Sequence, residues 1–87
     1  MSAVEYDFDV ISNRAVEALR GAFPNSVIEA NPSYRRRAHL RIISPAFNGK
    51  DEKEKQGLVW DVLRAELEED ADAVTLVLAY GVDELPL

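Results

Sequence analysis

The spacing of apolar residues indicates a helix near the start of the chain. From about residue 9 to 23 the apolar positions recur with a helical period. They form one stripe: Ile11, Ala15, Ala18, Leu19, Ala22 and Phe23. Asp9 or Ser12 is expected to cap its start, and Gly21 with Pro24 marks its end. Residues 1–8 alternate in character and are expected to form a flexible tail or a short edge strand.

Two strands are predicted next. Residues 26–31 indicate a short strand, and a polar connection over 31–37 leads into a second strand over 38–43. In the second strand, alternation places Leu40 and Ile42 on one face. His39, Arg41 and Ile43 fall on the other face. Two strands joined in this way predict an antiparallel hairpin.

A second helix is predicted over about 51–70, after a Pro-containing and Gly-containing turn near 44–49. Asp51 and Glu54 have the spacing of a capping box. The apolar stripe consists of Leu58, Val59, Val62, Leu63 and Leu67. The first two turns contain no apolar residue and include Gly57, so we expect the helix to fray or bend there.

The strongest strand pattern covers residues 73–80. Val74, Leu76, Leu78 and Tyr80 are predicted to share one face, and the other face is nearly apolar too, which is typical of a well-buried strand. The element order is α-β-β-α-β, with an extra turn near 46–49. This order predicts one α+β domain over residues 1–87, a two-layer sandwich with helices on one face of a mixed three-stranded sheet.

The segment from residue 38 to 50, Ala-His-Leu-Arg-Ile-Ile-Ser-Pro-Ala-Phe-Asn-Gly-Lys, resembles the BolA family. A His-containing strand opening, an Ile pair and a Ser-x-x-Phe-x-Gly turn occupy the family's positions. The pairs Ser33-Tyr34, Leu58-Val59 and Glu66-Leu67 extend the match. The resemblance implies the class II KH-like fold, αββ(α)αβ, and a non-enzymatic regulatory or adaptor function.

One departure from the family pattern concerns iron–sulfur chemistry. BolA proteins carry an Arg-His-Arg triplet whose His takes part in sharing a cluster with a monothiol glutaredoxin. This chain has Lys55-Gln56-Gly57 at that place. An amide is a poor ligand for iron–sulfur iron, which prefers thiolate and imidazole. Iron–sulfur trafficking with a glutaredoxin therefore ranks behind the other functions considered.

Composition narrows the chemistry further. The chain has no Cys, which excludes disulfides, thiolate metal ligands and a Cys nucleophile. His39 is the single His, and a metal site normally needs three or four converging ligands, so His39 is a low-ranking ligand candidate. We expect no enzyme activity, no cofactor and no metal site. With no signal sequence or membrane span expected, the predicted location is cytoplasmic.

One part of the chain holds a cluster of basic residues although the net charge is −6. They are Arg35, Arg36, Arg37 and Arg41, with Lys50 expected nearby and Tyr34 beside them. Such a cluster can contact nucleic-acid phosphates or an acidic protein, or it can be a solvated hairpin tip that discourages edge pairing. KH proteins that bind nucleic acid use a Gly-x-x-Gly loop, which this chain lacks.

Three functions follow from these observations, and none involves a membrane. The first is binding of a protein partner, with a monothiol glutaredoxin as the partner that the resemblance implies. The expected surface combines the helix that begins near Asp51, including Gln56, with the strand edge from Arg35 to Arg41. The second is nucleic-acid binding through the loop from Arg35 to Arg37, with Arg41 and Lys50. The third is cluster sharing. The sequence does not indicate an oligomeric state.

Overall fold

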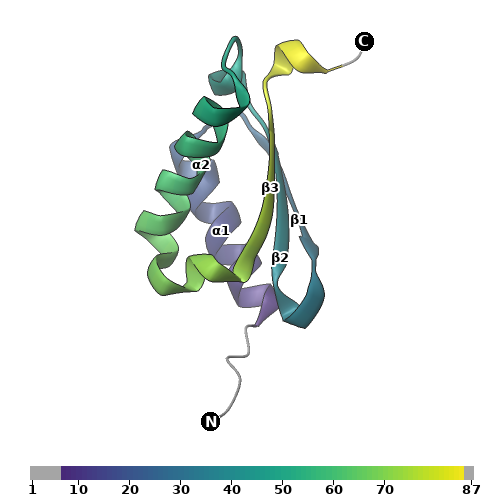
Figure 1. Cartoon of the computed structure of the whole chain (residues 1–87), viewed down its shortest axis with the longest axis vertical. Helices are drawn as coiled ribbons and strands as arrows, with labels where there is room; N and C mark the ends of the chain where they lie inside the picture. Colours follow the sequence, from purple (N-terminus) through teal and green to yellow (C-terminus); the bar gives the residue numbers. More distant parts are fainter. Residues whose placement is uncertain (1–6, 86–87) are drawn as a thin grey trace.

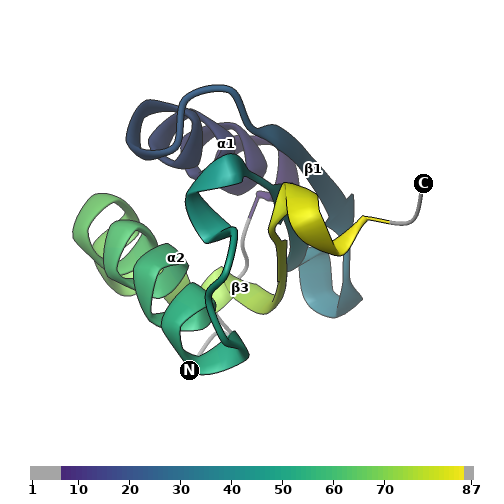
Figure 2. The same cartoon turned by 90° about the horizontal axis from the view of Figure 1, so that it is seen from above.

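The computed structural model describes residues 7–85 and consists of two helices packed on one face of a three-stranded sheet (Figures 1 and 2). The helices and strands, in chain order, are α1 (Phe8–Ala22), β1 (Val27–Pro32), β2 (Ala38–Ile43), α2 (Glu52–Leu67) and β3 (Val74–Tyr80). Short 3₁₀ turns connect them, including η2 (Pro45–Phe47) and η3 (Glu68–Ala73), and a further one, η4 (Val82–Glu84), follows β3. The predicted α+β two-layer fold is confirmed.

The start of α1 lies earlier than predicted. Asp7 is the N-cap, and its carboxylate accepts hydrogen bonds from the backbone amides of Asp9 (3.0 Å) and Val10 (3.3 Å). Neither Asp9 nor Ser12 is the cap; the Ser12 hydroxyl instead donates to the Asp9 carbonyl at 3.2 Å. Asp7 and Phe8 thus belong to the helix and not to a tail. The strand or tail predicted for residues 1–6 lies outside the described residues.

The start of α2 is regular, so the predicted fraying is wrong. The capping box is confirmed: the Glu54 amide donates to Asp51 at 2.8 Å, and Glu54 accepts from the Asp51 amide. The first turns of α2 have no apolar residue, but the side chain of Lys55 is buried there and is only 4% exposed. The helix ends at Leu67 and not at residue 70, since Glu68 has a φ of +54° that breaks the helical path.

The sheet has the order β1-β2-β3, with β1 antiparallel and β3 parallel to β2. Leu40 and Ile42 share one face, as predicted, and both are buried in the core on the helix side of the sheet. β3 differs from its prediction: it is an edge strand, and Leu76 and Leu78 are 42% and 41% exposed. Val74 does not share their face, because an irregularity in the β2–β3 register near Ala38 interrupts the alternation and turns Val74 into the core.

The core lies between the helices and the sheet. Its fully buried large side chains are Leu19, Leu40, Ile42, Phe47, Val59, Leu63 and Leu67. Three predicted stripe members lie outside it: Ala18 is half-buried, and Ala22 and Leu58 are exposed. The apolar stripes of both helices are therefore wider than the surface that the sheet covers. No helix among the described residues has the length and apolar character needed to cross a bilayer.

Candidate protein-binding surfaces

The structure separates the predicted site residues into groups. Tyr34 and Arg35–Arg37 form the turn between β1 and β2, whereas Lys50 precedes α2 at the opposite end of the sheet (Figure 1). β2 alone spans about 17 Å between these ends. Gln56 lies beside the middle of β3. The single composite surface predicted from the sequence is therefore not assembled, and Lys50 does not extend the basic turn.

The basic turn has an unusual backbone. Arg35 and Arg36 have φ values of +53° and +62°, in the left-handed region that favours Gly and Asn. The Arg37 amide donates to the Tyr34 carbonyl at 3.0 Å and closes the turn, and the Arg37 guanidinium lies 5.3 Å from the Tyr34 ring centroid. The side chains of Arg35 and Arg36 are exposed at the tip.

Arg41 and His39 lie on the face of the sheet that the helices leave open, which we call the open sheet face. Its register rows are Val27–Ile43–Tyr80, Glu29–Arg41–Leu78 and Asn31–His39–Leu76. Arg41 pairs with Glu29 at 2.9 Å across the strands. Around this pair, Val27, Leu76 and Leu78 are each exposed by 41–57%.

Sequence reasoning missed the open sheet face as a binding surface. The pattern of β3 is apolar on both sides and so indicates burial of both. The polar members of the face belong to β1 and β2, and only the strand order reveals that they share a surface with Leu76 and Leu78.

Gln56 makes three side-chain hydrogen bonds at the edge of the sheet, and in one of them its amide nitrogen donates to the Glu52 carboxylate at 2.9 Å. Its amide nitrogen donates to the Val77 carbonyl at 2.8 Å, and its amide oxygen accepts from the Trp60 indole at 3.0 Å. Trp60 is half-buried against the core, with the Arg64 guanidinium 5.6 Å from its ring centroid. Gln56 therefore fastens α2 to β3 through a carbonyl on the outer edge of the sheet.

Lys55 is bonded to the last turn of the described chain. Its ammonium donates to the two Glu84 carboxylate oxygens at 2.8 and 3.0 Å, and Glu52 lies 3.3 Å away. The hydrogen bond from Lys55 lowers the pKa of Glu84, with help from the Gly81 amide, and the same bond raises the pKa of Lys55. A Cβ at Gly81 would meet the Asn48 side chain, so η4 packs closely on the turn before α2.

These contacts test whether the site could hold an iron–sulfur cluster. Both polar groups of the Gln56 amide are engaged within the protein, and the neighbouring side chain is an ion-paired ammonium. His39 lies on the open sheet face, whereas Gln56 approaches β3 from the helix layer. The residues at the family's cluster position therefore do not fit an iron ligand. Between residues 7 and 85, no three His, Cys, Asp or Glu side chains form a group suited to a metal ion.

Comparison with solved structures identifies the fold as BolA-like. The BolA domain of SufE1 from Arabidopsis thaliana superposes with a TM-score of 0.62 and 26% identity, over 85% of this chain and 94% of that one. BolA1 from Arabidopsis thaliana has a TM-score of 0.62 and 21% identity, over 87% of this chain and 96% of that one. No family model matches the chain, and no curated protein matches it. The resemblance inferred from the sequence is confirmed.

Proposed function

We propose that this chain is a non-enzymatic BolA-like adaptor or regulatory module that acts by binding another protein on its open sheet face. The observation that carries the proposal is the exposure of Leu76 and Leu78 beside the Arg41–Glu29 pair. Apolar side chains surrounding paired charges of both signs suit a protein surface of mixed character, because apolar contact supplies affinity and the charges set orientation.

The first partner to test is a monothiol glutaredoxin, the partner that the BolA resemblance implies. We propose binding without cluster sharing, since Gln56 is committed to Val77 and Trp60. Cluster sharing would require this amide to leave these partners and still act as a poor iron ligand. The two modes differ in one observable: binding alone leaves the absorption spectrum of a cluster-loaded glutaredoxin unchanged.

Site-specific photocross-linking in living cells tests the open sheet face. A photoreactive phenylalanine derivative replaces Leu78 in one variant and Glu69, an exposed residue on η3, in the control. We expect a discrete adduct with a different protein at Leu78 only, lost when Leu76→Asp is added. Adducts at both positions, adducts with copies of this chain alone, or no adduct would overturn the proposal.

Titration with glutaredoxin then identifies the binding mode. We expect amide resonances of β2 and β3 to shift on addition of the protein, and the Leu76→Asp variant to lose this response. A change in the cluster spectrum on mixing would instead establish cluster sharing and contradict our interpretation of Gln56. If cross-linking identifies another protein, the same titration is repeated with it.

A second candidate, nucleic-acid binding, is favoured by the geometry of the basic turn. Two left-handed Arg residues cost about 1–2 kcal/mol each relative to Gly. A fold retains such strain most readily where the side chains are used. The exposed side chains of Arg35 and Arg36 suit phosphate contact, and the exposed ring of Tyr34, next to them in the chain, suits base stacking.

The matched test compares Arg35→Ala/Arg36→Ala with Arg20→Ala/Lys53→Ala, which removes the same charge from exposed helix positions. For a nucleic-acid-binding protein, affinity for a single-stranded oligonucleotide falls at least about tenfold in the turn variant only, and it falls steeply with salt. Equal losses in both variants, or no salt-dependent binding by the parent chain, would reject this candidate.

A further inference from the structure

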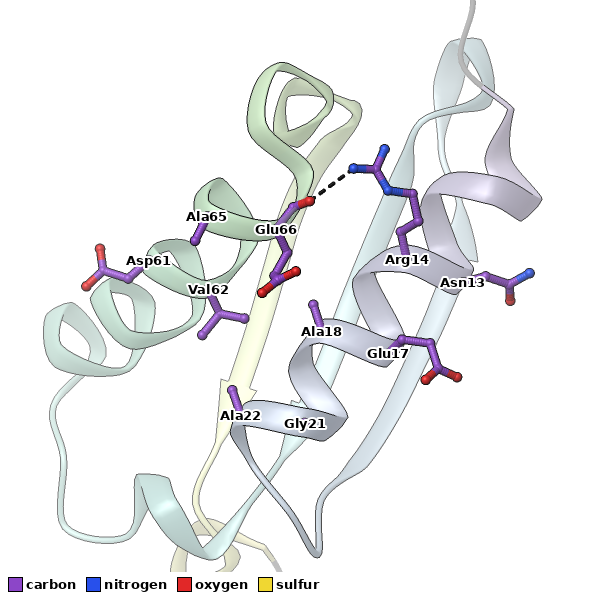
Figure 3. Close-up of a pocket in the computed structure, with 10 residues that line it drawn as sticks. All are labelled: Asn13, Arg14, Glu17, Ala18, Gly21, Ala22, Asp61, Val62, Ala65 and Glu66. Atoms are coloured by element: carbon purple, nitrogen blue, oxygen red, sulfur yellow. Dashed lines mark hydrogen bonds between the residues drawn. The ribbon is translucent and has the colours of Figure 1, made fainter.

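A groove of about 830 Å³ lies between α1 and α2 on the outer surface of the helix layer (Figure 3). It is separate from the open sheet face, which lies on the other side of the molecule. In Figure 3, Ala18 and Ala22 of α1 point into the space between the helices, and Val62 and Glu66 of α2 point into it from the other side. No segment of the described chain covers this space.

The lining is apolar because the helices carry more apolar residues than the core buries. Ala18 and Ala22 belong to the stripe predicted for α1, and Val62 to the stripe predicted for α2, yet all three line the groove. Leu58 lies one turn before Val62 on the same face of α2 and is 37% exposed. At Gly21 a Cβ would have no neighbour within 4 Å, so this wall is open as well.

The charges around the groove are mainly negative. Glu17, Asp61 and Glu66 all line it. Arg14 is the one cation in the lining, and its guanidinium is already bound by the Asp70 carboxylate at 2.8 Å and by the Glu66 carbonyl at 3.0 Å. The groove therefore has an apolar floor flanked by carboxylates. Arg14, the one cation in its lining, is already hydrogen-bonded to Asp70 and Glu66.

We infer that this groove binds a cationic amphipathic helix of a partner protein. Two nearly parallel ridges with an apolar trough fit a third helix, since α1 provides about 22 Å of wall, enough for about 15 helical residues. Apolar residues at positions i, i+3, i+4 and i+7 would enter the trough, and flanking Lys or Arg would meet the carboxylates.

The charge also decides between occupants. A second copy of this chain has a net charge of −6, and its helices would bring carboxylates toward carboxylates. A phosphate-bearing ligand is repelled for the same reason. Combined with the open sheet face, which rests on the proposed function above, the groove gives the module two binding surfaces on opposite sides, as a bridging adaptor needs.

Fluorescence anisotropy with a labelled model peptide tests this inference. The probe has about 18 residues of Leu, Ala and Lys at amphipathic helical spacing. Two comparison peptides are used: a scrambled version of the same composition, and a version with Glu in place of Lys. We expect the cationic amphipathic peptide alone to bind, and amide resonances of 14–22 and 58–66 to shift while those of β3 stay in place.

Two sets of variants locate the site. Asp61→Lys/Glu66→Lys reverses charge in the groove, and Glu69→Lys/Asp72→Lys makes the same change in net charge on η3. We expect the first to weaken binding at least about tenfold and the second less than about threefold, because screening limits distant charges. Gly21→Leu adds a bulky side chain at a lining position where a Cβ meets nothing within 4 Å, and it removes a helix-weakening Gly, so lost binding with retained stability supports the site.

The inference fails under any of four results. These are equal binding of the scrambled peptide, equal weakening by the two charge-reversal variants, unchanged binding by Gly21→Leu, or groove resonances that respond only to the concentration of this chain itself. The cross-linking position at Leu78 is on the other surface, so a negative result in either experiment leaves the other test intact.

Discussion

The Lys55 ammonium lies 2.8 Å from the Glu84 carboxylate, and this ion pair fastens the second turn of α2 to the last 3₁₀ turn of the described chain. The Lys55 side chain is almost completely buried, whereas Glu84 keeps 38% of its side-chain surface exposed. A buried cation depends on its partner, because an unpaired buried charge is strongly unfavourable. Lys55 also immediately precedes Gln56, so the ion pair fixes the part of α2 from which Gln56 reaches β3.

Glu84→Gln is expected to lower the Tm at pH 7, since Lys55 then keeps only its weaker contact with Glu52. The pKa of Glu84 is lowered in the folded protein, so the stabilisation is complete above the ordinary value of 4.5 and disappears as the pH falls through the lower folded pKa. The Tm difference between parent and variant should therefore shrink below about pH 4.5. A difference that is constant from pH 7 to pH 3 would contradict the pairing.

The same pair has an upper limit in pH. The pKa of Lys55 is raised above its ordinary value of 10.5, so the stabilisation is complete below that pH and is lost only as the pH rises through the higher folded pKa. Glu69→Gln is the matched control, because it makes the same chemical change at an exposed residue of η3. We expect its Tm to differ little from the parent's at any of these pH values.

At the turn formed by Arg35 and Arg36 we predict that a substitution stabilises the protein. Arg35→Asn/Arg36→Gly replaces two left-handed Arg residues with residues that tolerate positive φ. We expect a net gain of about 1–2 kcal/mol in the free energy of unfolding, which raises the Tm by several degrees. The gain is smaller than the summed cost of the two Arg residues, because Gly loses more backbone entropy on folding and Asn relieves the strain only in part. Urea unfolding measures it. Arg35→Ala/Arg36→Ala removes the same charges but keeps the strain, so stabilisation by this control would mean that charge repulsion is the cause.

The hydrogen bonds that Gln56 donates can be distinguished from the one that it accepts by comparing two substitutions. Gln56→Glu keeps an acceptor for the Trp60 indole but turns carboxylate oxygens toward the two groups that accept from Gln56, the Val77 carbonyl and the Glu52 carboxylate. We expect it to be less stable than Gln56→Ala, which should cost about 1–2 kcal/mol by leaving the Val77 carbonyl and the Trp60 indole unbonded. Urea unfolding gives the order of stability, and the indole proton resonance reports on Trp60. The reverse order would mean that the two bonds donated by Gln56 contribute little.

Much of the fold could be predicted because the signals are local. Alternation at Leu40 and Ile42 and the Asp51–Glu54 spacing depend only on neighbouring residues, and both predictions hold. The burial of Lys55 could not be predicted, since its partner lies 29 residues away and a run of charged residues indicates a solvated helix start. The candidate site was harder to predict because it also depends on residues far apart in the sequence. The open sheet face and the groove are the surfaces that the packed layers leave uncovered.

The last prediction compares the same substitution, Leu→Ala, at two positions of the apolar stripe of α2. Leu63 is fully buried and Leu58 is 37% exposed, although the sequence pattern gives them equal places in the stripe. Leu63→Ala should lower the free energy of unfolding by about 2–5 kcal/mol through lost burial and a cavity. Leu58→Ala should cost less than about 1 kcal/mol, because water already reaches that side chain. Urea unfolding of both variants measures the difference. Equal costs would place Leu58 in the core, as the sequence pattern predicts.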